Sequence, residues 1–208
     1  MERTDRHGHA ASLGWTLVAI GVCLTATAGA TYWDMWAFQQ AMRQVVAREH
    51  RASTSAGEEA TAGHIGFPWI LSVPRLDLSV SVLEGTAPET LQVAAGHILG
   101  TARPGSPGTT GIAAHRDTLF RPLRRIRAGD ALEIRTAGRR FGYVVTSTTV
   151  VAPGDTRVLA SSSEERVVLV TCYPFWFVGA APHRFVVFAR RVESPVRPPA
   201  PGLRPEER

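Results

Sequence analysis

The sequence predicts an all-β fold, a closed or nearly closed β-barrel with a few short helical turns, preceded by one transmembrane helix. Three features of the chain support this. Short β-branched runs alternate with glycine and proline through its middle, a run without charged residues lies near the N-terminus, and the C-terminal end is rich in proline. The 208 residues leave room for one compact domain with accessory segments.

The uncharged run extends from Leu13 to Trp33. At about 1.5 Å per helical residue it spans roughly 30 Å, the thickness of the hydrocarbon core of a bilayer. Trp15 lies near one end and Tyr32 and Trp33 lie at the other, where aromatic rings favour the headgroup region. Residues 28–30 (Ala-Gly-Ala) also fit a signal-peptide cleavage site. We favour an uncleaved anchor because the run is long and continues into helical sequence.

The segment after the anchor has two parts, a predicted helix and a predicted linker. Met35, Phe38 and Met42 recur at helical spacing, which predicts a helical stalk up to about His50. Small and polar residues then indicate a linker over residues 52–63. The predicted organisation is an N-terminal tail (1–12), a transmembrane anchor (13–33), a stalk with linker (34–65), a folded barrel domain (66–192) and a proline-rich, extended tail (193–208).

Strands of the folded domain are predicted from β-branched runs bounded by glycine or proline. The candidates are residues 70–73, 78–83, 111–114, 131–136, 141–151, 167–171 and 185–191. Two other runs, 91–95 and 119–125, fit short helical turns better. Many short strands with few helices are typical of a barrel, which holds side chains rigidly at its strand ends.

The charge does not indicate a nucleic-acid partner, although the formal net charge is +5 and all 23 basic residues are arginine. Within the domain only Arg124, Arg125 and Arg127 lie close together, and no aromatic-interleaved basic motif accompanies them. We therefore interpret the arginines as a solvated basic face.

The chain contains two cysteines, Cys23 and Cys172. Cys23 lies in the apolar run, so Cys172 is the one thiol of the folded domain and no disulfide framework is expected there. A lone thiol in an oxidising compartment is a liability unless it is buried or used.

Three strand ends carry chemically active side chains. The motif GIAAHRDT (residues 111–118) ends a small-residue strand in His115, VVLVTCYP (167–174) ends a β-branched strand in Cys172, and APHRFVV (181–187) begins a strand with Arg184. Each residue alone has an ordinary structural explanation: a buried apolar thiol, a satisfied polar ring, or a solvated cation. Their joint appearance favours catalysis.

Amide transfer needs this combination of groups. A thiol is mostly protonated at neutral pH, so an imidazole must share its proton. Attack on a carbonyl creates an oxyanion, which a fixed guanidinium can stabilise. The imidazolium then protonates the leaving amine, and an amine or water captures the thioester. We therefore predict Cys172 as nucleophile, His115 as acid/base and Arg184 as cationic stabiliser.

These motifs, together with GHILGT (residues 96–101), resemble the sortase family, most closely class D-like sortases. The likeness covers roughly residues 70–191. The family signature commonly reads Thr-Leu-x-Thr-Cys, and here Val168 replaces the first threonine.

The resemblance implies an eight-stranded barrel that cleaves a Leu-Pro-x-Thr-Gly-like sorting motif of secreted proteins. The acyl group passes to an amine on a cell-wall precursor or another protein, with the domain tethered outside the cytoplasm by a single-pass anchor. By matching position it implies catalytic roles for Cys172, His115 and Arg184. Thr171, Ala114 and Tyr173 are the candidate substrate-binding residues. No cofactor is expected, and the absence of an obvious carboxylate cluster leaves calcium dependence open.

The alternative function is a catalytically weak, membrane-tethered barrel that binds sorting-type peptides. A zinc site is disfavoured because His97, His115 and His183 lack a typical ligand spacing. His183 could itself be the base, but neighbouring strand residues point to opposite faces, so His183 and Arg184 would rarely enter one cleft together.

Overall fold

The computed structural model describes residues 5–55 and 66–192, with side chains over 14–48 and 66–192. The chain divides into two units, Met1–Phe38 and Gln39–Arg208, each described by itself. The predicted C-terminal tail and most of the predicted linker lie outside the described residues.

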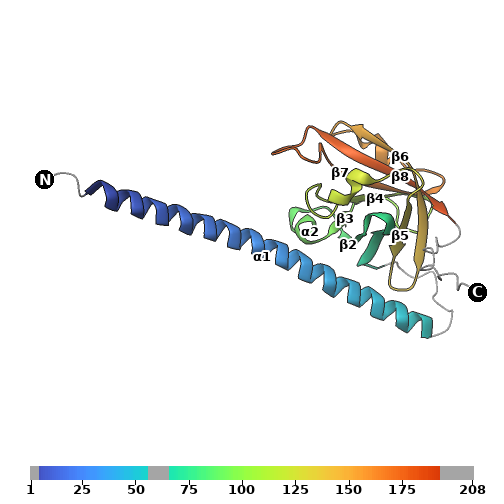
Figure 1. Cartoon of the computed structure of the whole chain (residues 1–208). Coiled ribbons are helices and arrows are strands. Elements are labelled where there is room, and N and C mark those ends of the chain that lie inside the picture. Colours follow the sequence, from blue (N-terminus) through green and yellow to red (C-terminus); the bar gives the residue numbers. More distant parts are fainter. Residues whose placement is uncertain (1–4, 56–65, 193–208) are drawn as a thin grey trace, which may run out of the picture. The chain divides into compact units, whose positions relative to one another are not determined.

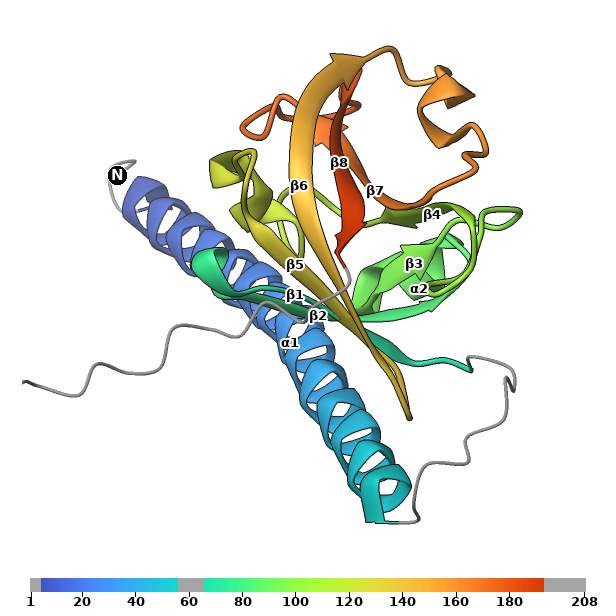
Figure 2. The same cartoon turned by 90° about the vertical axis from the view of Figure 1, so that its right-hand side faces the viewer.

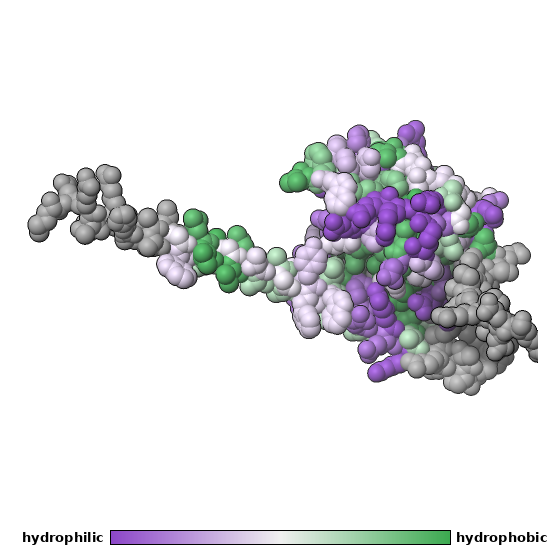
Figure 3. All heavy atoms as spheres, viewed as in Figure 1, coloured by the Kyte–Doolittle hydropathy of each residue, from purple (hydrophilic) through white to green (hydrophobic). Residues whose placement is uncertain are grey.

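The first unit consists of the beginning of helix α1 (Asp5–Ser55). Its side chains from Trp15 to Leu24 are strongly exposed and largely apolar (green in Figure 3). Gly14–Arg48 is long and apolar enough to cross a membrane. The helix already includes residues 5–12, which were expected to form the tail, and it continues without a break through residues 52–55 of the expected linker.

The second unit contains a closed barrel of eight strands, which confirms the predicted fold class (Figures 1 and 2). The strands follow one another around the barrel in the order β1-β2-β3-β4-β7-β8-β6-β5. Their bounds are β1 Trp69–Val73, β2 Leu78–Glu84, β3 Ala95–His97, β4 Gly108–Ala113, β5 Ala131–Arg135, β6 Arg140–Val151, β7 Glu165–Tyr173 and β8 His183–Val192.

Strand β3 was missed by the sequence analysis, which assigned residues 91–95 to a helical turn. The turn exists but lies earlier, as helix α2 (Pro88–Val93), and Ala95 already belongs to the strand. Three residues, Ala-Gly-His, are too few and too weakly β-forming to be recognised. The expected turn at 119–125 corresponds to the 3-10 helix η2 (Arg121–Arg125), and η1 (Pro74–Leu76) and η3 (Thr156–Leu159) were not foreseen.

The barrel core follows the alternation of each strand. In β5, Leu132 and Ile134 are buried on one face, whereas Glu133 and Arg135 lie on the other face. The largest completely buried rings are those of Trp69, Tyr143, Phe120 and Phe141. Burying such rings stabilises the fold by about 2–3 kcal/mol each.

Buried polar side chains join the strand connections. Asp130 accepts hydrogen bonds from the guanidinium of Arg75, at 2.6 Å from Nη2, and from the backbone N–H of Arg127 at 2.8 Å. The hydrogen bond from Arg75 is the main cause that holds the pKa of the Asp130 carboxyl below its ordinary value. This pair ties η1 to the start of β5.

The last turns of α1 belong to the same unit as the barrel. The buried side chain of Gln39 accepts from the N–H of Ser81 at 2.7 Å and donates to the carbonyl of Val93 at 2.6 Å. Arg43 also donates to the carbonyl of Ser79. The helix end therefore satisfies backbone groups of β2 and of the α2 region.

Candidate active site

The strand directions bring the three predicted catalytic residues to one end of the barrel. Strands β4 and β7 are parallel, so their carboxyl ends meet at the same edge of the sheet. Strand β8 runs antiparallel to β7 and begins at this edge. Cys172 lies near the end of β7, His115 follows β4 by two residues, and Arg184 lies near the start of β8.

Cys172 and Arg184 are direct partners in the β7–β8 ladder. Directly opposed residues of an antiparallel pair have side chains on the same face of the sheet. The preceding Thr171, which pairs with Phe185, lies on the other face and is only 3% exposed, whereas Cys172 is half-buried. The sulfur and the guanidinium therefore share the outer face.

The guanidinium of Arg184 is held by the chain that leads into β8. Its Nη1 donates to the carbonyl of His183 at 3.0 Å and to that of Ala181 at 3.2 Å. These contacts keep a permanent positive charge on the strand next to Cys172.

The backbone on both sides of His115 is anchored. The N–H of Ala114 donates to the carbonyl of Val170 at 3.3 Å, and the carbonyl of His115 accepts from the N–H of Phe120 at 2.9 Å. The imidazole itself is exposed. A fixed backbone with an exposed ring suits a group that must exchange protons with a substrate.

Of the predicted substrate-binding residues, Thr171 and Ala114 bind each other. The Thr171 hydroxyl donates to the Ala114 carbonyl at 2.7 Å, and both residues are buried. Tyr173 is half-buried and stacks against Phe185, with ring centroids 6.2 Å apart. Direct substrate contact by these three residues stays a prediction.

The outer face of β4 and β7 that leads to Cys172 carries small and apolar residues. Gly111 and Ala113 of β4 pair with Val168 and Val170 of β7. A Cβ atom at Gly111 would lie 3.0 Å from Leu159 Cδ2, so the connection that contains η3 covers this position closely. The face is therefore covered at Gly111, and its open part beside the thiol is formed by the half-buried Ala113 and Val170.

Comparison with known proteins agrees with this geometry. The family model of the Sortase domain matches residues 71–192, more than half of the chain. The chain belongs to the sortase family.

Two curated relatives are similar to this sortase. Sortase D of Bacillus subtilis (strain 168) is 33% identical over 124 residues, which cover 59% of this chain and 63% of that protein. Sortase SrtE1 of Streptomyces coelicolor is 28% identical over 152 residues, which cover 64% of this chain and 42% of that protein. The matched region spans less than two thirds of either relative.

Solved structures share the same barrel. A Clostridium perfringens sortase D5 transpeptidase superposes with a TM-score of 0.58 at 24% identity, covering 74% of this chain and 96% of that one. A lid mutant of sortase A from Corynebacterium diphtheriae superposes with a TM-score of 0.58 at 25% identity, over the same shares of the two chains.

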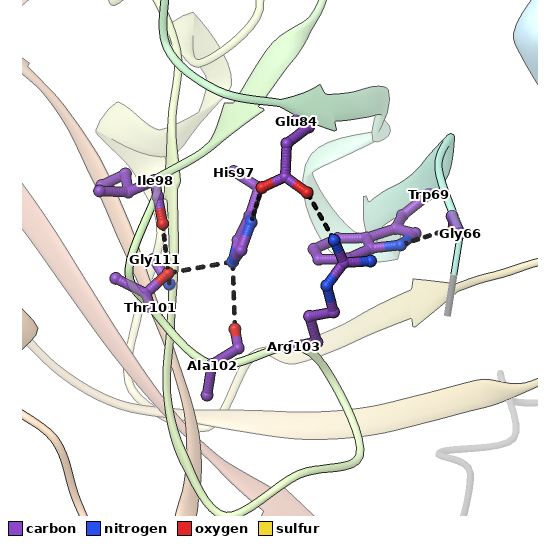
Figure 4. A network of polar contacts seen from close by, with 9 residues as sticks. All are labelled: Gly66, Trp69, Glu84, His97, Ile98, Thr101, Ala102, Arg103 and Gly111. Carbon is purple, nitrogen blue, oxygen red and sulfur yellow. Dashed lines mark hydrogen bonds and ion pairs between the residues drawn. The ribbon is translucent and has the colours of Figure 1, made fainter. Parts of the chain in front are cut away.

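The other two histidines of the barrel lie differently from His115. The ring of His97 is 2% exposed, and its Nδ1 lies 2.8 Å from Glu84 Oε1 (Figure 4). Its Nε2 lies 3.0 Å from the Thr101 hydroxyl and 3.1 Å from the Ala102 carbonyl. His183 is the ladder partner of Tyr173, on the face opposite that of Arg184. His97 is therefore a buried, hydrogen-bonded residue of the barrel of this sortase.

Sequence reasoning missed a set of arginines beside the site. Arg116 donates to the carbonyls of Phe177 and Gly179 in the connection between β7 and β8. Arg121 and Arg124 lie over the ring of Trp176 at 5.0 and 4.9 Å from its centroid. The run of aromatic residues after Cys172 was the one sequence feature that could have indicated these contacts. No local pattern connects that run to Arg116 or to η2.

Among the residues that the structure describes, no group of three His, Cys, Asp or Glu side chains is arranged to hold a metal ion. That this sortase needs no cofactor stays a prediction from the sequence.

Proposed function

We propose that this chain is a membrane-anchored cysteine transpeptidase that cleaves an LPxTG-like sorting motif through a thioester on Cys172. His115 shares the proton of the thiol and returns it to the leaving amine, and Arg184 stabilises the oxyanion. The acyl group passes to an amine on a cell-wall precursor or another protein. The observation that carries the proposal is the pairing of Cys172 with Arg184 at the barrel end where β4 delivers His115.

The substrate peptide binds along the outer face of β4 and β7. The small side chain of the half-buried Ala113 leaves room for an extended backbone, and the half-buried Val170 supplies apolar contact for the leucine and proline of the motif. The secreted proteins that carry such a motif are the proposed acyl donors. The apolar part of α1 is the proposed single-pass anchor, with the barrel outside the cytoplasm.

The reaction needs two reactants, the sorting peptide and the acceptor amine. The thiolate sulfur forms a bond to the carbonyl carbon of Thr in the motif, the C–N bond between Thr and Gly breaks, and the leaving amine takes the proton from His115. An incoming amine then forms the new C–N bond, releases the thiolate and gives its proton to His115.

The test uses the full-length chain in detergent micelles with a library of sorting-type peptides and an amine acceptor. Wild-type protein should release the peptide after Thr and form the amide with the acceptor, and an intact-mass measurement should trap the thioester. Cys172→Ala should abolish both. Unchanged cleavage by Cys172→Ala would reject the proposal, and peptide binding without any thioester would favour the alternative of a binding module.

A further inference from the structure

The connection between β7 and β8, residues 174–182, joins the strand of Cys172 to the strand of Arg184. Near the start of this loop the half-buried Phe175 packs against Tyr173 and Phe185, with ring centroids 6.0 and 5.3 Å away. The next three side chains point outward, and Trp176 is 67% and Val178 94% exposed. Apolar burial therefore anchors the start of the loop but not its tip.

The tip is held instead by arginines from the segment that follows His115. Arg116 Nη2 lies 2.5 Å from the carbonyl of Phe177 and 3.1 Å from that of Gly179, and its guanidinium lies 6.0 Å from the Phe177 ring. Arg121 and Arg124 approach the Trp176 ring. These three arginines are called the arginine clasp below.

The clasp connects all three proposed catalytic positions. Arg116 is bonded directly to His115, and the loop that it holds begins two residues after Cys172 and ends two residues before Arg184. A shift of the loop would move the end of β7 and the start of β8 relative to the His115 segment. Misplacement of a catalytic group by about 1 Å costs on the order of a hundredfold in rate.

We propose that Arg116 is a positioning residue for the transfer reaction, which holds the β7–β8 loop so that His115, Cys172 and Arg184 keep their mutual spacing. This inference rests on the proposed function. A guanidinium is suited to the task because one planar group donates to two carbonyls and still lies against the ring of Phe177. Both hydrogen bonds come from Nη2, and a lysine side chain ends one bond before this position and has no planar group to lie against the ring.

The kinetic test compares Arg116→Ala, Arg116→Lys and the control Arg125→Ala in the full-length chain in micelles. Arg125 is an exposed arginine at the end of η2, beside Arg124 of the clasp, so its loss removes the same charge from the same region of the surface. The active fraction of each variant is titrated as the fraction of protein that forms the Cys172 thioester with peptide in the absence of acceptor, read by intact mass. We expect Arg116→Ala to lower kcat about tenfold to a hundredfold, with the KM for the peptide changed less than about twofold.

Arg116→Lys should recover little of this loss, because the charge returns on a shorter side chain that has no planar group to lie over Phe177. Arg125→Ala should keep the wild-type kcat. Wild-type kcat in Arg116→Ala, full rescue by Arg116→Lys, or an equal loss in Arg125→Ala would each overturn the inference. A mere loss of folding would instead lower the titrated active fraction and leave kcat per active site unchanged.

Hydrogen exchange supplies a readout that does not need turnover. In Arg116→Ala the amides of residues 176–180 should exchange at least about tenfold faster, while those of β4, β7 and β8 keep their rates. Unchanged exchange in the loop would overturn the inference. Wild-type protein that cleaves no sorting-type peptide would reject the proposed function, and the effect of Arg116 would then be judged by exchange and by the alkylation rate of Cys172.

Discussion

The side-chain hydroxyl of Thr171 donates a hydrogen bond to the carbonyl oxygen of Ala114, 2.7 Å away in the barrel interior. Thr171 immediately precedes Cys172, and Ala114 immediately precedes His115. A single buried hydrogen bond therefore joins the residue before the proposed nucleophile to the residue before its proposed acid/base. Its role is to fix spacing, because the hydroxyl proton is already used inside the barrel.

Replacing Thr171 by Val should weaken both the fold and the reaction. Valine keeps the shape but removes the donor, which leaves the buried Ala114 carbonyl without this partner at a cost of about 1–3 kcal/mol. We expect a lower urea midpoint and a kcat reduced about tenfold or more. Thr171→Ser keeps the hydroxyl and should retain most of the activity. Equal kcat and stability in Thr171→Val and wild type would show that the bond has no such role.

Arg184 and its neighbour His183 provide a matched pair, because they lie on opposite faces of β8. Arg184→Ala should lower kcat about a hundredfold, which corresponds to about 3 kcal/mol of transition-state stabilisation. His183→Ala should stay within about twofold of wild type. Steady-state peptide cleavage distinguishes the two, and the reverse ranking would favour His183 as the catalytic residue.

Removal of His115 and of His97 should have different consequences. His115→Ala removes an exposed ring, so the fold should keep its stability while the cleavage rate falls to a small fraction of the wild-type rate. His97→Ala removes a buried ring and leaves Glu84 and Thr101 without that partner, which should lower the free energy of unfolding by about 2 kcal/mol or more. Urea titration beside cleavage kinetics checks both, and a stable His97→Ala protein would contradict the assignment.

The features that could be predicted from the sequence are those carried by local pattern. Seven of the eight strands follow from β-branched runs, and His115, Cys172 and Arg184 were each recognised beside a strand end. Periodicity and turn residues are properties of neighbouring positions, so one sequence suffices to recognise them.

The features that were missed depend on pairing between distant segments. Strand β3 exists because Gly96 and His97 pair with β2 on one side and β4 on the other, and three residues carry no periodicity of their own. The opposition of Cys172 and Arg184 follows from the β7–β8 register, which the length and path of the loop determine. The contact from Arg116 to Gly179 spans 63 positions and has no local signal.

Asp130 should make the stability of the barrel depend on pH. Its folded-state pKa is lowered, first by the hydrogen bond from Arg75, so its contribution is present above the unfolded pKa of about 3.9 and is lost as the pH falls through the folded value. Asp130→Asn should cost about 1 kcal/mol at pH 7, a modest value because Arg75 is partly exposed to solvent. The difference from wild type should shrink below about pH 4, as measured by urea titrations from pH 7 to pH 3. A difference that grows on acidification would contradict this sign.

Gly96 tests how closely the strands approach where β3 was missed. A Cβ atom at this position would lie 2.2 Å from the carbonyl oxygen of Gly85, while the N–H of Gly85 donates to the carbonyl of His97 at 2.9 Å. Gly96→Ala must therefore push backbone against backbone at the β2–β3 pairing, at a cost of about 1–3 kcal/mol or more. Gly154→Ala is the control, because nothing lies within 4 Å of its Cβ position. Equal urea midpoints for the two variants would mean that β3 can shift without losing its pairing. We expect a lower midpoint for Gly96→Ala alone, because the backbone carbonyl of Gly85 cannot move aside as a flexible side chain can.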